Sequence, residues 1–275
     1  MSEHWIERRT ADGSSTLAHG AHGETFHSLS GAWTQARERY ARECRLRERA
    51  LELARAGTRT LRLLDIGTGL GFNLAAALEA LDGTGVELEA TSLERDAELL
   101  ARVAQDPREP ADLELWHAHV RSALRAAFAR PADDAVPLAT GRLRLRIGDA
   151  RASLADLPDG ARFDAVFLDP FSPRVEPDLW SREFLAAVAR RMDPGSRLST
   201  YSAATEVRVG LHAAGLRVGP GVPVGEKREG TLASPDQELT SFEPRIQRRL
   251  VSRARSIPMD PGFGPRAGGT RGSIP

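Results

Sequence analysis

The sequence has few of the features that mark secreted, membrane-spanning or disulfide-rich proteins. Cys44 is the one cysteine among 275 residues, so no disulfide can form within the chain. No apolar run reaches the roughly 18 residues that span a bilayer. The first residues lack the basic start and the apolar stretch of a signal peptide. We therefore expect a cytoplasmic protein without a membrane partner, with Cys44 as a partly buried structural thiol.

An excess of charge of one sign is lacking too. The 38 lysine and arginine residues balance the 38 aspartate and glutamate residues, so the formal net charge is zero. The charge of the whole chain therefore gives no sign of a nucleic-acid partner, although it leaves room for a local basic patch. Lysine is nearly absent, and Lys227 is the only one. Where arginine is the usual cation, a single lysine favours a role that uses its compact charge.

Metal ligands are scarce as well. His117 and His119 lie two residues apart, but no cysteine or second acidic cluster completes a ligand set around them. The sequence therefore predicts no metal site, and we do not expect Cys44 to be a catalytic nucleophile.

From about residue 58 onward, strand-like and helix-like segments alternate. Compact apolar runs of strand length alternate with amphipathic helical patterns, the strands at 61–66, 88–93, 143–147, 163–169 and 197–202 and the helices at 73–81, 95–105, 181–192 and 206–215. Strands and helices that alternate through short connections form a parallel sheet with right-handed crossovers and helices on both faces. The sequence thus predicts an α/β fold with a doubly wound, mostly parallel, Rossmann-like sheet.

Three segments depart from this alternation. Residues 10–30 predict an irregular or short-stranded entry segment, and residues 33–56 predict one exposed amphipathic helix that ends at Gly57. Residues 106–142 predict a helical insertion between two core strands. The Gly/Pro/Arg-rich end of the chain predicts disorder. The expected division is an N-terminal extension and helix at 1–57, one main domain at 58–252 and a disordered tail at 253–275.

A glycine-rich turn gives the strongest local signal of a ligand site. Asp65, Gly67, Gly69 and Gly71 lie directly between the first strong strand and the helix that follows it. Glycines let the backbone turn sharply beside a ligand, and the helix start presents free N–H groups. A dinucleotide-binding loop would need its third glycine at position 72, where Phe72 stands. The spacing favours a nucleoside-type cofactor without a pyrophosphate, with Asp65 reaching its amino-acid end; a plain strand-to-helix connector is the alternative.

Two more acids end later strands of the predicted sheet. Glu94 follows Gly71 by 23 residues, and a carboxylate there can accept both hydroxyls of a ribose. Asp149, followed by Ala150, ends the strand at 143–147, where an acid can accept from the exocyclic amine of an adenine. Each acid alone could be a solvated strand end. Together with the glycine turn they indicate one ligand, S-adenosyl-L-methionine.

A further acid ends the strand at 163–169. Asp169 begins the block Asp-Pro-Phe-Ser-Pro, and in this topology its position faces the reactive sulfonium of the cofactor. A carboxylate there can orient an attacking amine and take its proton. Pro170 and Pro173 make the turn rigid and hold Asp169 and Phe171 in place. An aspartate that only caps the turn is the alternative.

Residues 167–215, together with 63–73, resemble the MnmC/MnmD-type tRNA methyltransferases. The more specific parts are the block at 169–173, the Pro-Asp-Leu-Trp at 177–180 and the Gly-Glu-Lys-Arg at 225–228. The resemblance covers roughly residues 10–235. It implies a Rossmann-like class I methyltransferase with a small N-terminal extension and S-adenosyl-L-methionine as cofactor. It also implies methyl transfer to the amino group of 5-aminomethyl(-2-thio)uridine at the wobble position of tRNA.

The resemblance also implies roles for single residues. Carried over by position, it implies that the cofactor is held by Gly67, Gly69, Gly71, Glu94 and Asp149, that the amine lies at Asp169, and that the nucleobase pocket is shaped by Phe171 and Pro173. Lys227 and Arg228 would contact RNA phosphate or the substrate base, with a plain surface pair as the alternative. Bifunctional relatives carry a flavin-dependent oxidase in the same chain. None is recognised here, so we expect a separate oxidase to supply the aminomethyl substrate.

The N-terminal part departs from the family pattern. Gln35 stands where relatives carry an acid, and the segment 26–28 lacks a tyrosine. Two other functions therefore stay open at this point. One is a transferase that uses the same cofactor on a small amine. The other is a catalytically weak cofactor-binding partner in RNA modification.

Overall fold

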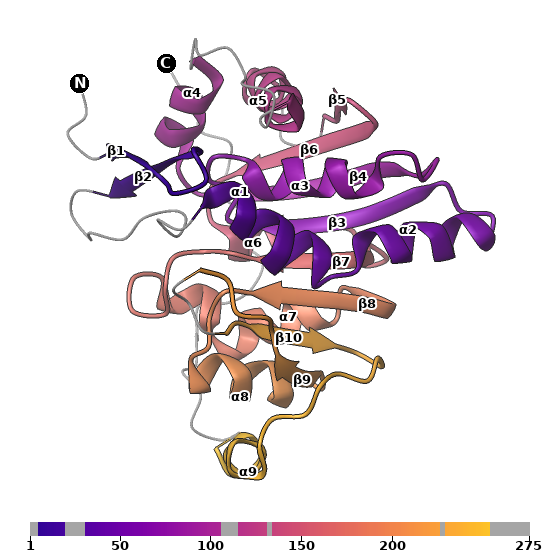
Figure 1. Ribbon diagram of the computed structural model, residues 1–275, viewed down its shortest axis with the longest axis vertical. Helices are drawn as coiled ribbons and strands as arrows, with labels where there is room; N and C mark the ends of the chain where they lie inside the picture. The colour runs from indigo at the N-terminus through magenta and orange to yellow at the C-terminus, as the bar shows by residue number, and fades with distance from the viewer. Residues whose placement is uncertain (1–4, 20–30, 106–114, 131–133, 226–228, 254–275) are drawn as a thin grey trace.

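A computed structural model of the protein describes residues 5–19, 31–105, 115–130, 134–225 and 229–253. An eight-stranded sheet runs through the molecule, with helices on both of its faces (Figure 1). Five strands pair in parallel, namely β3 (Thr60–Ile66), β4 (Glu87–Glu94), β6 (Gly141–Ile147), β7 (Phe163–Leu168) and β8 (Met192–Thr200). Three further strands pair antiparallel at the two edges, namely β5 (Val136–Leu138), β9 (Arg217–Pro220) and β10 (Thr231–Ser234). The predicted α/β class with a mostly parallel sheet is confirmed.

The order of the strands places a crevice at the centre of the sheet. The order is β5-β6-β4-β3-β7-β8-β10-β9, so the chain leaves β3 toward β4 on one side and later returns to β7 on its other side. In open parallel sheets, ligands bind outside the carboxyl ends of the strands where the order reverses. The fold therefore brings together the ends of β3, β4 and β7.

Side chains of the central strands alternate between two apolar cores. In β3, Leu61 and Leu63 belong to the core on one face, whereas Leu64 and Ile66 belong to the core on the other face. This period of two is what a strand buried on both faces requires. In β7 every residue is buried, which explains its nearly continuous apolar sequence.

Helices cover the two faces in separate groups. One face packs against α1 (Ala32–Gln35), the π-helix η1 (Ala36–Arg42), α2 (Leu46–Arg55), α3 (Phe72–Leu81), α4 (Ala97–Gln105) and α5 (Leu115–Phe128). The opposite face packs against α6 (Ala150–Ala155), α7 (Arg182–Ala189) and α8 (Thr205–Ala213), and α9 (Pro244–Ser252) packs on α8. A short 3-10 turn, η3 (Pro177–Trp180), precedes α7, and β1 (Trp5–Arg9) and β2 (Ser15–His19) form a separate antiparallel hairpin.

The prediction of one exposed helix over 33–56 is wrong. The segment forms three pieces, α1, η1 and α2, and Arg45 before α2 has a left-handed backbone with φ of 52°. Arg39 and Tyr40 of η1 are buried, and Cys44 is fully rather than partly buried at 2% exposure. The face that carries these residues packs on the sheet. The alternating charges of the segment had instead indicated an exposed helix.

Other expectations are met in part. Helix α7 ends at Ala189, and Met192 of the expected 181–192 helix already belongs to β8. The expected helical insertion contains α5, but it also contributes the edge strand β5, which the sequence did not indicate. Most of the expected disordered tail, at 254–275, lies outside the described residues, as do 20–30 and 106–114. Among the described helices, none has the length and apolar character needed to cross a membrane.

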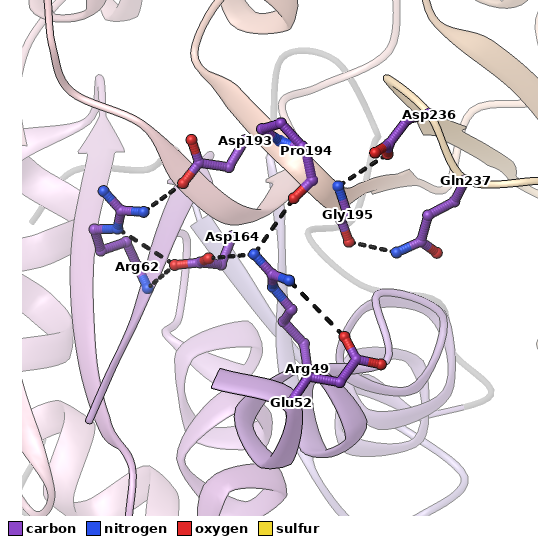
Figure 2. Close-up of polar contacts among 9 residues, drawn as sticks. All are labelled: Arg49, Glu52, Arg62, Asp164, Asp193, Pro194, Gly195, Asp236 and Gln237. Carbon is purple, nitrogen blue, oxygen red and sulfur yellow. Dashed lines mark hydrogen bonds and ion pairs between the residues drawn. The ribbon is translucent and has the colours of Figure 1, made fainter. Parts of the chain in front are cut away.

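A cluster of charged residues joins the amino ends of β3, β7 and β8 (Figure 2). The crevice lies at the other, carboxyl ends of the strands. Asp164 of β7 is 1% exposed and accepts from Arg49 Nη2 of α2 and from the backbone N–H of Arg62 of β3, both over 2.9 Å. Arg62 also pairs with Asp193 of β8. The cluster therefore stabilises the frame that carries the crevice while lying outside it.

Candidate active site

The glycine turn after β3 has the backbone conformation that the sequence indicated. Gly67, Gly69 and Gly71 have φ of 85°, 53° and 84°, a region that residues with a side chain rarely adopt. A Cβ atom at Gly67 would lie 2.5 Å from the carbonyl oxygen of Asp169. The turn after β3 and the turn after β7 therefore approach each other too closely for any side chain at position 67.

Glu94 fixes this turn to the end of β4. Its Oε2 accepts from Gly69 N over 2.8 Å, and its Oε1 accepts from the N–H groups of Arg95 and Asp96 over 2.7 Å and 2.9 Å. Burial raises the pKa of Glu94, while these three backbone bonds lower it. The carboxylate therefore holds the glycine turn in place and also lines the cavity beside it.

Asp65 lies under the glycine turn and is fully buried. Its Oδ2 accepts from Ser92 Oγ over 2.5 Å, and Ser92 Oγ is also 2.7 Å from Thr68 Oγ1. No described residue donates to Asp65 Oδ1. Burial raises the pKa of Asp65 to about 7, and the charges of Asp169 and Glu94 add to the rise. A buried acceptor among three acids fits a cationic ligand.

A cavity of about 210 Å³ opens between the turns that follow β3, β4, β6 and β7. It is lined by Ile66, Gly67, Leu93, Glu94, Arg95, Asp149, Ala150, Arg151, Pro170, Val175, Glu176, Pro177, Asp178 and Leu179. Its volume is below the roughly 300–1,000 Å³ of complete small-molecule pockets, so it accounts for one part of a nucleoside cofactor. The structure thus brings Glu94, Asp149 and Ala150 together around one space, as the sequence indicated.

Asp149 also has a local structural role. Its carboxylate accepts from Arg151 N over 2.9 Å as the N-cap of α6 and pairs with Arg151 Nη2 over 2.7 Å. Arg151 Nη1 reaches Asp178 across the cavity mouth at 3.3 Å. The sequence did not indicate Arg151, because its contact with Asp178 joins the segments that follow β6 and β7.

Asp169 is held by a residue that the sequence analysis did not identify. Asn73, the second residue of α3, donates from Nδ2 to Asp169 Oδ2 over 2.8 Å. The backbone N–H of Asp169 donates to the carbonyl oxygen of Ile66 over 2.8 Å. In the sequence, the one feature that could have indicated Asn73 is its position two residues after Gly71, the last glycine of the turn.

Both tyrosines of the chain lie near the turn that Asp169 begins. Tyr40 of η1 packs its ring on Phe167 with 5.3 Å between centroids. Burial, followed by the charge of Asp169, raises the pKa of Tyr40 well above its usual value. Tyr201 donates from its hydroxyl to the carbonyl oxygen of Pro170 over 2.9 Å.

A buried cation lies next to Tyr40. Arg39 is 1% exposed and donates from Nη1 to the carbonyl oxygen of Val222 over 2.7 Å. Burial lowers the pKa of Arg39, and the charges of Tyr40, Glu43 and Asp169 oppose that shift. Arg39 and Tyr40 therefore bring the rare π-helix η1 into the electrostatic surroundings of Asp169, and π-helical turns are frequent at functional sites.

The turn after β7 is braced from within. Phe171 receives two supports, since its N–H donates to Glu176 Oε2 over 2.9 Å and its carbonyl accepts from Trp180 Nε1 over 2.8 Å. Phe171 and Pro173 are half-buried in this turn. Lys227 and Arg228 lie outside the described residues.

His117 has a packing role rather than a place in a metal site. It lies in α5, stacks on Phe72 with ring centroids 4.1 Å apart and is 2.7 Å from the carbonyl oxygen of Leu70. Within the described part of the chain, no group of three or more His, Cys, Asp or Glu side chains could hold a metal ion.

Comparison with known proteins shows the family to which the chain belongs. A family model described as S-adenosyl-L-methionine-dependent methyltransferase matches residues 114–236. The crystal structure of MNMC2 from Aquifex aeolicus superposes with a TM-score of 0.76 at 30% identity, covering 94% of this chain and 79% of that one. The chain belongs to the MnmC2 methyltransferase family. S-adenosyl-L-methionine is the cofactor of this family, and three acids around a glycine turn suit its positive charge.

The curated relatives of this MnmC2 family member are longer proteins. The tRNA 5-methylaminomethyl-2-thiouridine biosynthesis bifunctional protein MnmC of Paracidovorax citrulli is 36% identical over 81% of this chain and 34% of its own length. The protein of the same name from Chromobacterium violaceum is 32% identical over 78% of this chain and 33% of its own length. The chain therefore spans about a third of the length of these two relatives.

Proposed function

We propose that the protein transfers a methyl group from S-adenosyl-L-methionine to the amino group of 5-aminomethyl(-2-thio)uridine at the tRNA wobble position. The observation that carries this proposal is Asp169, held by Asn73 at 2.8 Å and in backbone contact with the glycine turn after β3. An acid at that junction suits a reaction in which an amine must be oriented and deprotonated. The names of the relatives supply the tRNA substrate class.

The residues at the ends of β3, β4 and β6 would hold the cofactor. Asp65, with its unpartnered buried Oδ1, would accept from the ammonium group of the cofactor. Glu94 would accept from the ribose hydroxyls, and Asp149 and Ala150, which line the same cavity as Glu94, would contact the adenine. When bound, the cofactor supplies an electrophilic methyl group, whose carbon bonds to the amine nitrogen as the carbon–sulfur bond breaks and its electron pair stays on sulfur.

Asp169 would act on the incoming amine. An alkylammonium ion has no lone pair, so it must lose a proton before its nitrogen can attack. The Asp169 carboxylate accepts that proton and passes it to solvent, and the ionised carboxylate then orients the neutral amine. The hydrogen bond from Asn73 keeps the carboxylate in one position. Phe171 and Pro173, in the same braced turn, would shape the pocket for the uracil ring. We further propose that Lys227 and Arg228 contact the RNA.

The substrate must come from a reaction that leaves a free aminomethyl group on the uridine. The relatives are named as bifunctional proteins. We infer that a flavin-dependent oxidase, which removes a carboxymethyl group, acts before this protein. A small free amine is the second candidate substrate, and the zero net charge of the chain favours it.

The test is methyl incorporation from labelled S-adenosyl-L-methionine into tRNA that carries 5-aminomethyluridine, with the wild type and Asp169→Asn. We expect labelling of the wobble nucleoside by the wild type. In the variant we expect a rate lower by about 100-fold or more, because a positioned proton acceptor typically contributes 10²–10⁴-fold. Cofactor binding, measured by calorimetry, should persist in the variant. Normal cofactor binding with no labelling of tRNA would contradict the tRNA substrate, and labelling of a free amine would establish the second candidate.

A further inference from the structure

Asn73 is a buried amide between the cofactor turn and the acid at the end of β7. Asn73 is 2% exposed, and its Nδ2 donates to Asp169 Oδ2 over 2.8 Å. An ionised carboxylate can only accept hydrogen bonds, so the NH₂ group of the amide must face Asp169. The carbonyl oxygen, Oδ1, is then fixed on the other side of the same planar group.

This Oδ1 atom is an acceptor without a donor. It is buried, and no residue that the structure describes donates to it. A buried acceptor that lacks a hydrogen bond destabilises the folded state relative to a satisfied one. Most buried polar atoms in proteins are satisfied, and an exception calls for an explanation. Because Asn73 also holds Asp169, we take the missing donor to be part of the substrate.

We propose that Asn73 Oδ1 and the Asp169 carboxylate bind the two N–H groups of the amine that receives the methyl group. The proposal rests on the proposed function. A neutral primary amine has two N–H donors and one lone pair, so two acceptors that hold both hydrogens direct the lone pair away from themselves. An ionised carboxylate has about four acceptor sites, so the bond from Asn73 leaves Asp169 able to accept from the amine.

The same pair of acceptors selects a primary amine and limits transfer to one methyl group. The product of the first transfer is a secondary amine with one N–H group. In a second transfer, one of the two acceptors would face the new methyl group and lose its hydrogen bond. A site built to accept from an N–H group strongly rejects an analogue that lacks it. Asn73 is therefore a residue that determines the number of methyl groups added.

Two substitutions separate this role from a structural one. Asn73→Ala removes both the donor and the acceptor and leaves space for a methyl group. We expect kcat to fall about 10- to 100-fold and a dimethylated nucleoside, absent from the wild type, to appear in mass spectra of digested tRNA. Asn73→Asp keeps an acceptor but places a second carboxylate beside Asp169. Like charges raise the pKa of one member of such a pair, so we expect its kcat profile to shift to higher pH with only one methyl added.

Asp164→Asn is the matched control (Figure 2). Asp164 is also a buried polar residue that joins two elements, α2 and β3, but it lies at the amino end of β7, whereas Asp169 follows its carboxyl end. This substitution should lower stability without changing the pH profile or the methylation state. A wild type that binds cofactor but does not methylate the tRNA would refute the proposed function itself. An active wild type together with an Asn73→Ala variant of full kcat and single methylation would overturn the role of Asn73. If Asn73→Ala does not fold, an unchanged pH profile in Asn73→Asp overturns it.

Discussion

The pKa of Asp65, the buried acid beneath the glycine turn, is raised into the neutral range. Burial raises its pKa to about 7, with Asp169 and Glu94 adding to the rise and bonds from Ser92 and Thr68 opposing it. The pKa of an aspartate in the unfolded chain is 3.8, so ionisation of Asp65 costs the folded state stability as the pH rises from about 4 through about 7. A cation bound beside Asp65 offsets that cost, because it favours the ionised form.

From this coupling we predict that the affinity for S-adenosyl-L-methionine rises between about pH 6 and about pH 8, as Asp65 loses its proton. Asp65→Asn keeps the shape of the side chain but cannot ionise, so its affinity should be lower at about pH 8 and nearly independent of pH. Calorimetric titration of both proteins across this range measures the effect. An equally steep rise in Asp65→Asn would assign the pH dependence to another group, with Glu94 the next one to replace.

At the scale of elements, one aspartate joins the N-terminal hairpin to the first helix. Asp12, in the turn between β1 and β2, accepts from the N–H and the hydroxyl of Thr34, both over 2.9 Å, and from Ser14 Oγ over 2.6 Å. Gly31 precedes α1 with φ of 144°, and a Cβ atom there would lie 2.2 Å from Asp12 Oδ2. The hairpin and α1 therefore depend on this carboxylate for their contact.

Burial raises the pKa of Asp12, but hydrogen bonds from Ser14, Thr34 and Thr10 outweigh it and lower the pKa to about 2. An acid with a lowered folded pKa stabilises the protein above its unfolded value of 3.8, and that contribution is lost as the pH falls toward 2. We predict that Asp12→Asn unfolds at lower denaturant concentration than the wild type at neutral pH. The difference should shrink below about pH 4. Equilibrium denaturation at several pH values tests this, and a difference that does not depend on pH would contradict the role of the charge.

The sequence predicted those elements whose signal is local. The apolar run of β7 and the glycine turn after β3 each have their own pattern, so the sequence alone predicts both. The burial of Arg39 and Tyr40 was missed, because the alternating charges of their helix match a solvated surface and only the packing on the sheet reverses that reading. Asn73 was missed because its role comes from a turn that lies 96 residues further along the chain.

At the scale of the whole molecule, the sheet topology converts separate sequence motifs into one site. The reversal of strand order at β3 brings the turns after β3, β4 and β7 to the same edge. The charged cluster around Asp164 (Figure 2) lies at the amino ends of the strands, whereas the candidate site lies at their carboxyl ends. The effects of substitutions in the two groups on stability should therefore add independently, since distant sites usually act additively.

The balance of charge over the whole chain also bears on the proposed substrate. A protein with zero net charge cannot attract tRNA through a general positive field, so the contact must depend on a few local cations. Each phosphate that is neutralised lowers the logarithm of affinity by roughly 0.7–0.9 per tenfold rise in salt. For two or three phosphates, we predict that the KM for tRNA rises about 10- to 30-fold between roughly 50 mM and 200 mM salt, while kcat and the KM for the cofactor stay nearly constant. Initial rates over this range measure it. A KM for the methyl acceptor that does not change with salt concentration would favour a small amine, which binds without phosphate contacts.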